Sequence, residues 1–428
     1  MIIGSVYPMT IHVPPKKPQA MQSTAKSVRY PAIDLPTIVS RSGLVMRSCP
    51  VSTLPGNRIR FSKSGTGRRS SFDCERQPVP ADRAETNRSS RAFLFSPLID
   101  LVFVANLYWP LLLLIDVMGG VSTHESLIFW QIYFITAPHR WITLILVAFD
   151  HQQTGDRRAL FAMVAIAIAV GCLTLRWGTG TLLCLGVIDY VWNAWHFASQ
   201  HHGIFRIYQR KTKPAGPAPE TTGGATGTRV WGPRLEKLFF RGFLLYVIAR
   251  VAGWGWSEGP FAGSERVVGL DWVALTVPVC LLGVELIRCR RSITTALGGL
   301  CYLTSMLTLF TAMLMAAHFE RSQLVIQLAL ASAVFHSLEY MSIVTWSAQR
   351  KKNLTKQTVF SRLARTWMLF LVLFVVVIGV GNYLLSRGFF EIWVTINLIV
   401  AFWHYCFDGM IWKSRKPAPT PPLGVTTG

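Results

Sequence analysis

Apolar runs of about 20 residues, separated by short polar connections, recur along this chain from residue 94 to residue 412. A helix needs about 20 predominantly apolar residues to cross a hydrocarbon core of about 30 Å. Hydrophobic residues make up 51% of the 428 residues and charged residues only 15%, whereas about 25% of a soluble domain is charged. The sequence therefore predicts an all-α, polytopic transmembrane helical bundle.

The hydropathy pattern predicts ten spans, at 94–117, 126–149, 159–175, 181–205, 237–256, 268–287, 294–316, 323–346, 366–386 and 390–412. A segment rich in Pro, Gly and Thr at 209–235 is expected to form a flexible cytoplasmic loop. It divides the membrane part into spans one to four (92–208) and spans five to ten (236–413). Residues 414–428 are expected to be a cytoplasmic tail.

Basic residues cluster at one end of the spans. Even-numbered spans are followed by Asp156-Arg157-Arg158, Gln209-Arg210-Lys211, Arg288-Cys289-Arg290-Arg291, Arg350-Lys351-Lys352 and Lys413-Ser414-Arg415-Lys416. Odd-numbered spans are followed by weakly charged loops such as Gly119-Gly120-Val121-Ser122. By the positive-inside rule, both termini are cytoplasmic. We expect a multi-pass protein of the cell membrane, taken to be a bacterial inner membrane.

The net charge of +22 would indicate a nucleic-acid partner in a soluble protein. Here the basic residues lie in the connections, where anionic membrane lipids explain them, and no nucleic-acid partner is expected. Residues 1–91, rich in Arg, Ser and Pro, are expected to be a disordered basic tail. A start codon placed too far upstream, with Met21 or Met46 as the true start, and a transit peptide are the other interpretations. The eight Cys show no CxxC pairing, which argues against a disulfide framework, c-type haem or a zinc ribbon.

Four histidines lie at nearly the same depth in four spans that run in the same direction. His139, His196, His336 and His404 are eight to ten residues from the predicted cytoplasmic ends of spans two, four, eight and ten. At 1.5 Å per residue, each lies about 12–15 Å from the cytoplasmic edge. Ionisable residues inside a membrane indicate function, and imidazole is a common metal ligand. The sequence predicts a ring of imidazoles where these spans meet.

A second tier of polar residues lies nearer the cytoplasm: His151, His201, His202, Glu339 and Asp408. Glu339 follows His336 by three residues and Asp408 follows His404 by four, so each pair shares one helix face. Span four also carries a polar stripe at helical spacing, formed by Asp189, Asn193, His196 and Gln200. This stripe is expected to face the bundle interior. His201 and His202 lie close enough to the interface for simple solvation to be the alternative explanation.

A non-haem metal oxidoreductase is the first functional interpretation, because imidazole and carboxylate ligands with open positions suit Fe(II) and oxygen activation. The expected metal ligands are His139, His196, His336, His404, His201 and His202. Asp189, Glu339 and Asp408 are the expected catalytic carboxylates. Iron is the expected metal, and a lipid-soluble substrate would enter laterally from the bilayer.

The run from His196 to His201-His202 resembles a histidine box of the membrane fatty-acid desaturase and hydroxylase group. This resemblance implies iron, oxygen, a lipid substrate and an external electron donor. The chain departs from that pattern in three ways: it lacks an early His-x(3–4)-His box and a second His-His pair, and it has ten predicted spans rather than about four to six. The runs Trp195–Tyr208 and Trp403–Lys413 also resemble uncharacterised polytopic bacterial membrane proteins, which implies no activity.

Three other functions remain open. The stripe of span four, with Glu339 and Asp408, would serve a proton-coupled transporter or channel, although no internal repeat is evident. Two opposed His could be axial ligands of haem b. A transferase using a His base is the third. Any single His could instead join helices by hydrogen bonds. Arg140, next to His139, requires a partner, with Glu339 and Asp189 as candidates. His12, His124 and His318 receive no role, and Asp271 and Glu285 are expected to be solvated.

Overall fold

The computed structural model describes residues 92–150, 154–212, 232–257, 265–290, 292–351 and 359–412. These residues form helices and no β-strand, which confirms the all-helical prediction. The predicted tails, His151 and most of the predicted loop at 209–235 lie outside the described residues. The start of that loop is helical, because the helix of span four continues to Lys211.

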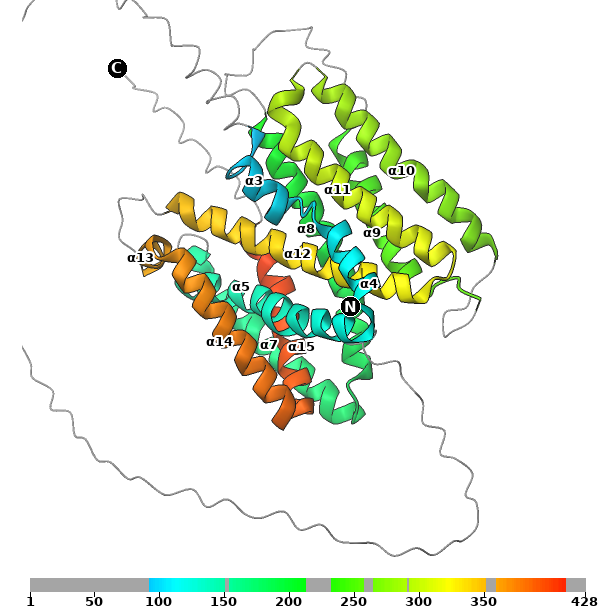
Figure 1. Cartoon of the computed structure of the whole chain (residues 1–428). Helices are drawn as coiled ribbons and strands as arrows, with labels where there is room; N and C mark the ends of the chain where they lie inside the picture. The colour runs from blue at the N-terminus through cyan, green and yellow to red at the C-terminus, as the bar shows by residue number, and fades with distance from the viewer. Residues whose placement is uncertain are drawn as a thin grey trace, which may run out of the picture. The chain divides into compact units, whose positions relative to one another are not determined.

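The main helices, labelled in Figure 1, are α4 (Trp109–Trp130), α5 (Ala137–Phe149), α7 (Arg158–Thr179), α8 (Leu183–Lys211), α9 (Pro233–Val251), α10 (Glu265–Cys289), α11 (Ile293–His318), α12 (Ser322–Lys351), α14 (Trp367–Gly388) and α15 (Phe390–Ile411). Shorter elements are α3 (Pro97–Ile99), the π-helical segments η1 (Asp100–Val104) and η2 (Gln131–Thr136), the 3₁₀ turn η3 (Gly155–Arg157) and α13 (Val359–Arg365).

Seven stretches of the described chain are long and apolar enough to cross a membrane, rather than ten. One of them, Trp109–Phe149, runs through predicted spans one and two, although Gly120 at φ 67° interrupts its helical geometry. The predicted fourth and fifth spans correspond to α8 and α9. Both are long, but their apolar character is diluted by the polar stripe of α8 and by charged residues at the start of α9.

The beginning of the first predicted span is not a regular helix. Asp100 accepts hydrogen bonds from the backbone amides of Leu94 and Phe95. Asn106, at φ 47°, donates to the carbonyl of Phe335 on α12. These local bonds compete with the helical ladder, and a regular helix begins only at Trp109. The expected span at 94–117 was therefore wrong in its first half.

Pro138 explains the irregular turn before α5. Proline has no amide hydrogen to donate and its ring crowds the preceding turn, and here a π-helical segment comes directly before it. Such segments inside helices are frequent at functional sites. The turn leads directly into His139, whose Nδ1 lies 2.9 Å from the carbonyl of Thr136.

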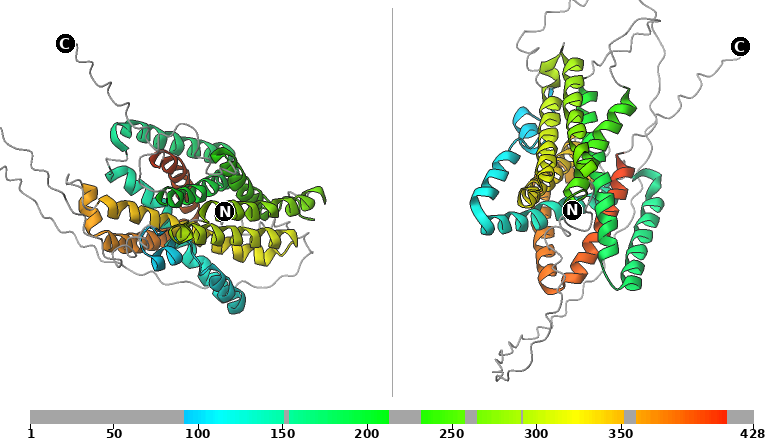
Figure 2. Two further views of the ribbon diagram at one scale, coloured as in Figure 1. Left: turned by 90° about the horizontal axis from the view of Figure 1, so that it is seen from above. Right: turned by 90° about the vertical axis from the view of Figure 1, so that its right-hand side faces the viewer.

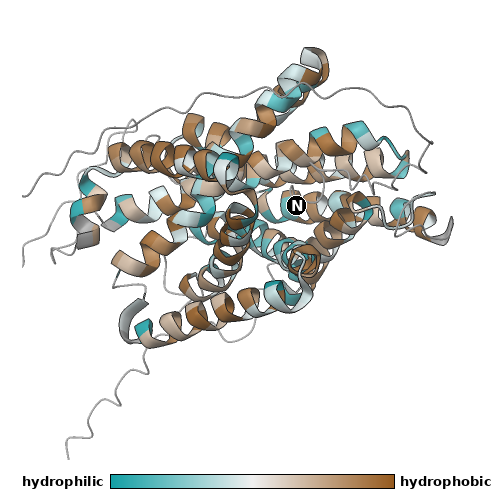
Figure 3. Cartoon of the chain, turned by 90° about the horizontal axis from the view of Figure 1, so that it is seen from below, coloured by the Kyte–Doolittle hydropathy of each residue, from teal (hydrophilic) through white to brown (hydrophobic). Residues whose placement is uncertain are grey.

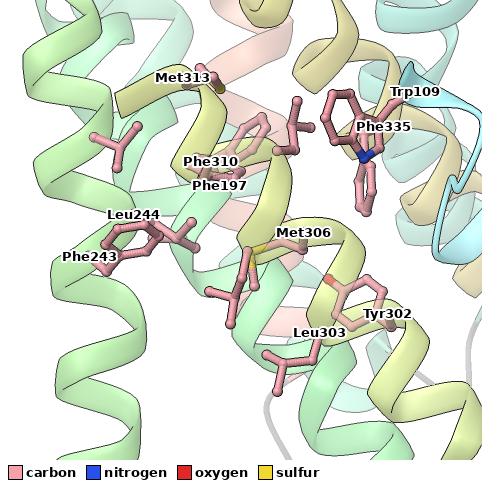
Figure 4. Close-up of a cluster of buried hydrophobic side chains, with 14 of the residues drawn as sticks. Trp109, Phe197, Phe243, Leu244, Tyr302, Leu303, Met306, Phe310, Met313 and Phe335 are labelled. Atoms are coloured by element: carbon pink, nitrogen blue, oxygen red, sulfur yellow. The ribbon is translucent and has the colours of Figure 1, made fainter. Parts of the chain in front are cut away.

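Helix α12 has neighbours on both sides in Figure 1, with α9, α10 and α11 above it and α5, α14 and α15 below. The two views of Figure 2 keep the same two groups of helices apart. A large hydrophobic cluster fills the space between α8, α9, α11 and α12, and Figure 4 shows Phe197, Phe310, Met306 and Phe335 converging in it. This packing holds α8 and α12 against each other along the segment that carries the polar residues.

Hydrophobic side chains cover much of the outer surface of the described helices. On α14, seven large aliphatic residues between Leu369 and Leu384 are exposed, while only Trp367, Gly379 and Asn382 are buried. Figure 3 shows hydrophobic residues along most helices, with hydrophilic ones in smaller numbers. An apolar exterior of this extent agrees with helices that are long and apolar enough to cross a membrane.

Candidate functional site

The structure brings His139, His196, His336 and His404 together from α5, α8, α12 and α15. Their ring centroids are 4.6 to 5.3 Å apart for four of the neighbouring pairs. All four side chains are buried. The four histidines that were expected to lie at one depth are thus side by side, in the interior of the helical bundle.

His139, His196 and His404 form the first of two groups whose ligand atoms lie within 4.8 Å of one another. The Nε2 atoms of His196 and His404 are 3.1 Å apart. The Nδ1 atom of His139 donates to the Thr136 carbonyl, because a carbonyl can only accept. This bond leaves the Nε2 lone pair of neutral His139 free, and that atom is buried without a partner.

A chain of polar contacts fixes the orientation of His404. Its Nδ1 atom lies 2.7 Å from Oγ1 of Thr143, which lies 2.8 Å from the hydroxyl of Tyr340. Tyr340 also hydrogen-bonds to the carboxylate of Asp408. The chain returns to the first group, because Oδ2 of Asp408 is 3.8 Å from Nδ1 of His196.

His201, His336 and Glu339 form the second group, again with ligand atoms within 4.8 Å of one another. Nδ1 of His201 is 3.0 Å from Glu339, and Nδ1 of His336 is 3.8 Å from the same carboxylate oxygen. The Gln200 amide and the Tyr302 hydroxyl donate to Glu339 at 2.8 and 2.9 Å. His201 and Glu339 are completely buried, so the interpretation of His201 as a solvated interface residue was wrong.

The site contains several buried nitrogen atoms that have no hydrogen-bond partner. Both ring nitrogens of His336 and Nε2 of His201 lack one, as does Nε2 of His139. Leaving a buried polar group unsatisfied costs about 1–3 kcal/mol. The two groups adjoin, because His336 contacts the rings of His139, His196 and His201. The unsatisfied atoms therefore collect in one small volume.

Three of the predicted site residues lie outside both groups: Asp408, which borders the first group at His196, and His202 and Asp189. His202 is one residue from His201, and successive helical residues point about 100° apart, so it contacts Phe240 on α9 instead. Asp189 accepts a hydrogen bond from Tyr405 at 2.9 Å. Of the two candidate partners of Arg140, Asp189 is the one within electrostatic reach.

Several polar residues that the structure buries were not predicted from the sequence. Thr143, Tyr302 and Tyr340 orient the two groups, but a lone hydroxyl residue in an apolar span gives no signal of this role. The expectation that Asp271 and Glu285 are solvated was wrong, because both are buried. Asp271 pairs with Arg250 at 2.9 Å and with His318 at 2.9 Å. These contacts join α9, α10 and α11 and contribute nothing to the histidine cluster.

Chemically, the cluster offers five imidazoles and two carboxylates at close range in a buried setting. Neutral imidazole and carboxylate are ligands for iron, manganese, zinc and copper, and the same groups transfer protons. Comparisons of the chain with protein-family models, with curated proteins and with solved structures found no match. The resemblance to the histidine-box enzymes therefore rests on the residues alone, and the structure directs His201 and His202 to different surroundings.

Proposed function

We propose that this protein is an integral membrane metalloenzyme whose histidine cluster binds iron and oxidises a lipid-soluble substrate. The cluster is buried within helices whose exterior is apolar, so the substrate class that can approach it is lipid-soluble. An external electron donor would complete the reaction. Seven described stretches are apolar enough to span a membrane; with α8, α9 and the division at Gly120 added, the proposal has ten spans and both termini in the cytoplasm of a bacterial cell.

One observation carries the proposal: three imidazole lone pairs converge. Nδ1 of His139 and Nδ1 of His404 are engaged by Thr136 and Thr143. Nδ1 of His196 faces the Asp408 carboxylate. With the protons held on these Nδ1 atoms, the Nε2 lone pairs of His196 and His404 face each other at 3.1 Å. Such an arrangement is repulsive unless a cation lies between them.

The spacing fits a shared metal ion. Imidazole nitrogens lie about 2.0–2.1 Å from a bound metal, so two ligands at tetrahedral or octahedral angles are about 2.9–3.4 Å apart. The observed 3.1 Å falls in this range. Hydrogen bonds from ligand His to carbonyls, hydroxyls and carboxylates are also the usual means of fixing the metal-binding nitrogen.

The residues can be given distinct roles. His139, His196 and His404 would hold the first ion, and His201, His336 and Glu339 would hold a second. Bound iron would supply the one-electron chemistry that protein side chains lack. Asp408, through Tyr340 and Thr143, keeps the proton of His404 on Nδ1 and so keeps Nε2 available. Gln200 and Tyr302 each donate a hydrogen bond to one oxygen of Glu339 and so keep its carboxylate oriented.

Haem b fits the cluster less well. Two axial imidazoles on opposite sides of one iron need nitrogen atoms about 4 Å apart, twice the metal–nitrogen distance, with the porphyrin between them. His196 and His404 are closer than this. Phe197 stacks on His336 at 4.1 Å and occupies one face of that ring.

Metal analysis of the purified protein, together with an optical spectrum, tests the proposal. We expect iron in stoichiometric amount and no Soret band. His404→Ala should lose most of the metal, while His124→Gln should keep it, because His124 pairs with Asp116 away from the cluster. A metal-free protein, or equal metal content in both variants, would contradict the proposal.

A proton relay is the second candidate, and one feature favours it. Tyr208 donates to Asp100 at 2.8 Å and stacks on Tyr302 at 5.9 Å between centroids. Tyr302 in turn donates to Glu339, which contacts His201. This line of groups links the cluster to Asp100. A metal-free protein that acidifies vesicles, and that stops when Tyr302 is changed to Phe, would place this function first.

A further inference from the structure

Helices α8 and α9 present a group of basic side chains that the histidine cluster does not use. His202 on α8 lies within electrostatic reach of Arg206, Lys237 and Arg241. Arg206 is one helical turn beyond His202, and Lys237 and Arg241 are one turn apart on α9, so the four define a shared basic face. We refer to these four residues as the α8–α9 basic face.

Two members of this face carry buried atoms without a partner. Nε2 of His202 has no hydrogen bond, and His202 is only 8% exposed. Nε of Arg241 is also buried and unpartnered. No described carboxylate lies within ion-pair distance of Arg241, whose guanidinium instead sits over the ring of Trp195 at 5.2 Å. The Nε–H of Arg241 is a hydrogen-bond donor, and Nε2 of neutral His202 is a donor in one of its two tautomers.

The one nearby acid is already engaged elsewhere. Glu236 pairs with Arg288 at 2.8 Å and accepts from Gln209 at 3.2 Å. Arg206 is 3.9 Å from Glu236 and donates to Gln209 at 2.8 Å. Arg288 also pairs with Glu285. Arg206 and Arg288 together offset Glu236 and Glu285, so the charges of Lys237 and Arg241 remain in excess on the α8–α9 basic face.

The position of the face along the helices matches the membrane boundary. His202 is nine residues before the end of α8 at Lys211, and Arg241 is eight residues after the start of α9 at Pro233. At 1.5 Å per residue, each lies about 12–14 Å from its helix end. A 29-residue helix is about 43 Å long and exceeds a hydrocarbon core of about 30 Å by about 13 Å. His202 and Arg241 therefore lie near the level where hydrocarbon gives way to headgroups.

We propose that the α8–α9 basic face binds a phosphate group, supplied by the headgroup of an anionic phospholipid. An unpaired guanidinium at the edge of the hydrocarbon is costly, and a phosphate offers it charge-assisted hydrogen bonds in the geometry that Arg prefers. The acyl chains of the lipid would lie along the exposed apolar surface of α8, beside Trp195 and Val191. This site is independent of the metal proposal.

Thermal unfolding of the full-length protein in a neutral detergent tests the site. Phosphatidylglycerol, diacylglycerol with the same acyl chains, and inorganic phosphate are added separately, and bound lipid is counted by native mass spectrometry. Phosphatidylglycerol should stabilise the protein and bind, and diacylglycerol should not. Arg241→Gln should weaken binding about fivefold, the value expected for one basic contact, and His202→Gln should weaken it by removing the ring nitrogen that meets the phosphate. Arg290→Gln, which removes the same charge as Arg241→Gln at an exposed position in the turn after α10, should leave binding unchanged.

The outcomes separate the sources of phosphate. Stabilisation by the lipid alone supports a headgroup site, and stabilisation by inorganic phosphate as well supports a site open to soluble phosphate. If phosphatidylglycerol and diacylglycerol act alike, or if Arg290→Gln weakens binding as much as Arg241→Gln, the site does not exist. Should Arg241→Gln fail to fold, His202→Gln provides the same comparison without loss of a permanent charge.

Discussion

Replacing Thr143 by Val tests whether the polar chain behind His404 controls metal binding. The two side chains have nearly the same shape, so the substitution removes the hydroxyl and leaves the packing. Two contacts are lost, at 2.7 Å to His404 and 2.8 Å to Tyr340. Tyr340 keeps Asp408 as an acceptor, whereas Nδ1 of His404 loses the hydroxyl that it contacts.

The expected cost follows from that one buried group. An unsatisfied buried donor costs about 1–3 kcal/mol, and without Thr143 the proton of His404 is free to move to Nε2, where it competes with the metal. Loss of such an orienting contact typically lowers metal affinity about 10–100-fold. We expect a loss in this range for Thr143→Val.

Anaerobic titration with Fe²⁺ against a competing chelator measures the affinity, and thermal unfolding measures the stability. Thr143→Ser is the matched control, because it keeps the hydroxyl and loses only a methyl group. Affinity of the Val variant within twofold of the natural protein would refute the reasoning. So would an equal loss in the Ser variant, because that result would point to packing rather than to the hydrogen bond.

Three further outcomes are expected. Gly298→Ala should destabilise the protein by about 1–3 kcal/mol, because the new Cβ would collide with the Ala92 carbonyl, while Gly283→Ala, which meets open space, should be neutral in the same thermal unfolding assay. Arg250→Met should cost about 3–5 kcal/mol by leaving the buried Asp271 without its guanidinium partner and with only His318 and Tyr246 in contact, and the double variant with Asp271→Leu should recover part of this loss. Acidification from about pH 7 to about pH 5 should release metal, since imidazole ligands must be deprotonated to bind; metal retained after dialysis at the lower pH would count against an imidazole site.

Some of the site could be predicted from residue spacing. The matched depth of His139, His196, His336 and His404 follows from their positions in apolar runs. The end of each run marks the same membrane surface, so the number of residues from that end gives the depth. The burial of the stripe on α8 follows from the cost of exposing polar groups to lipid. These inferences need only the rise per residue and the residues per turn of an α-helix, together with the thickness of a membrane.

Other parts were beyond the reach of such patterns. The separation of His201 from His202 depends on how α8 is rotated against α9 and α12, and adjacent residues of one helix look equivalent in a sequence. The burial of Asp271 depends on Arg250 and His318 from two other helices. A hydropathy value describes one residue and takes no account of its partners on other helices. Such a value therefore predicts that each of these polar residues is exposed to water.

The sequence by itself determined that this chain forms apolar helices and that four of them carry a histidine at matched depth. Only the tertiary structure decided that the Nε2 atoms of His196 and His404 face each other at 3.1 Å, and that His336 and Glu339 form a second group with His201. The physical reason is that helix formation and depth are properties of one segment and its solvent. The direction of each ring depends on hydrogen bonds from other helices, such as those that Thr143 and Tyr302 provide.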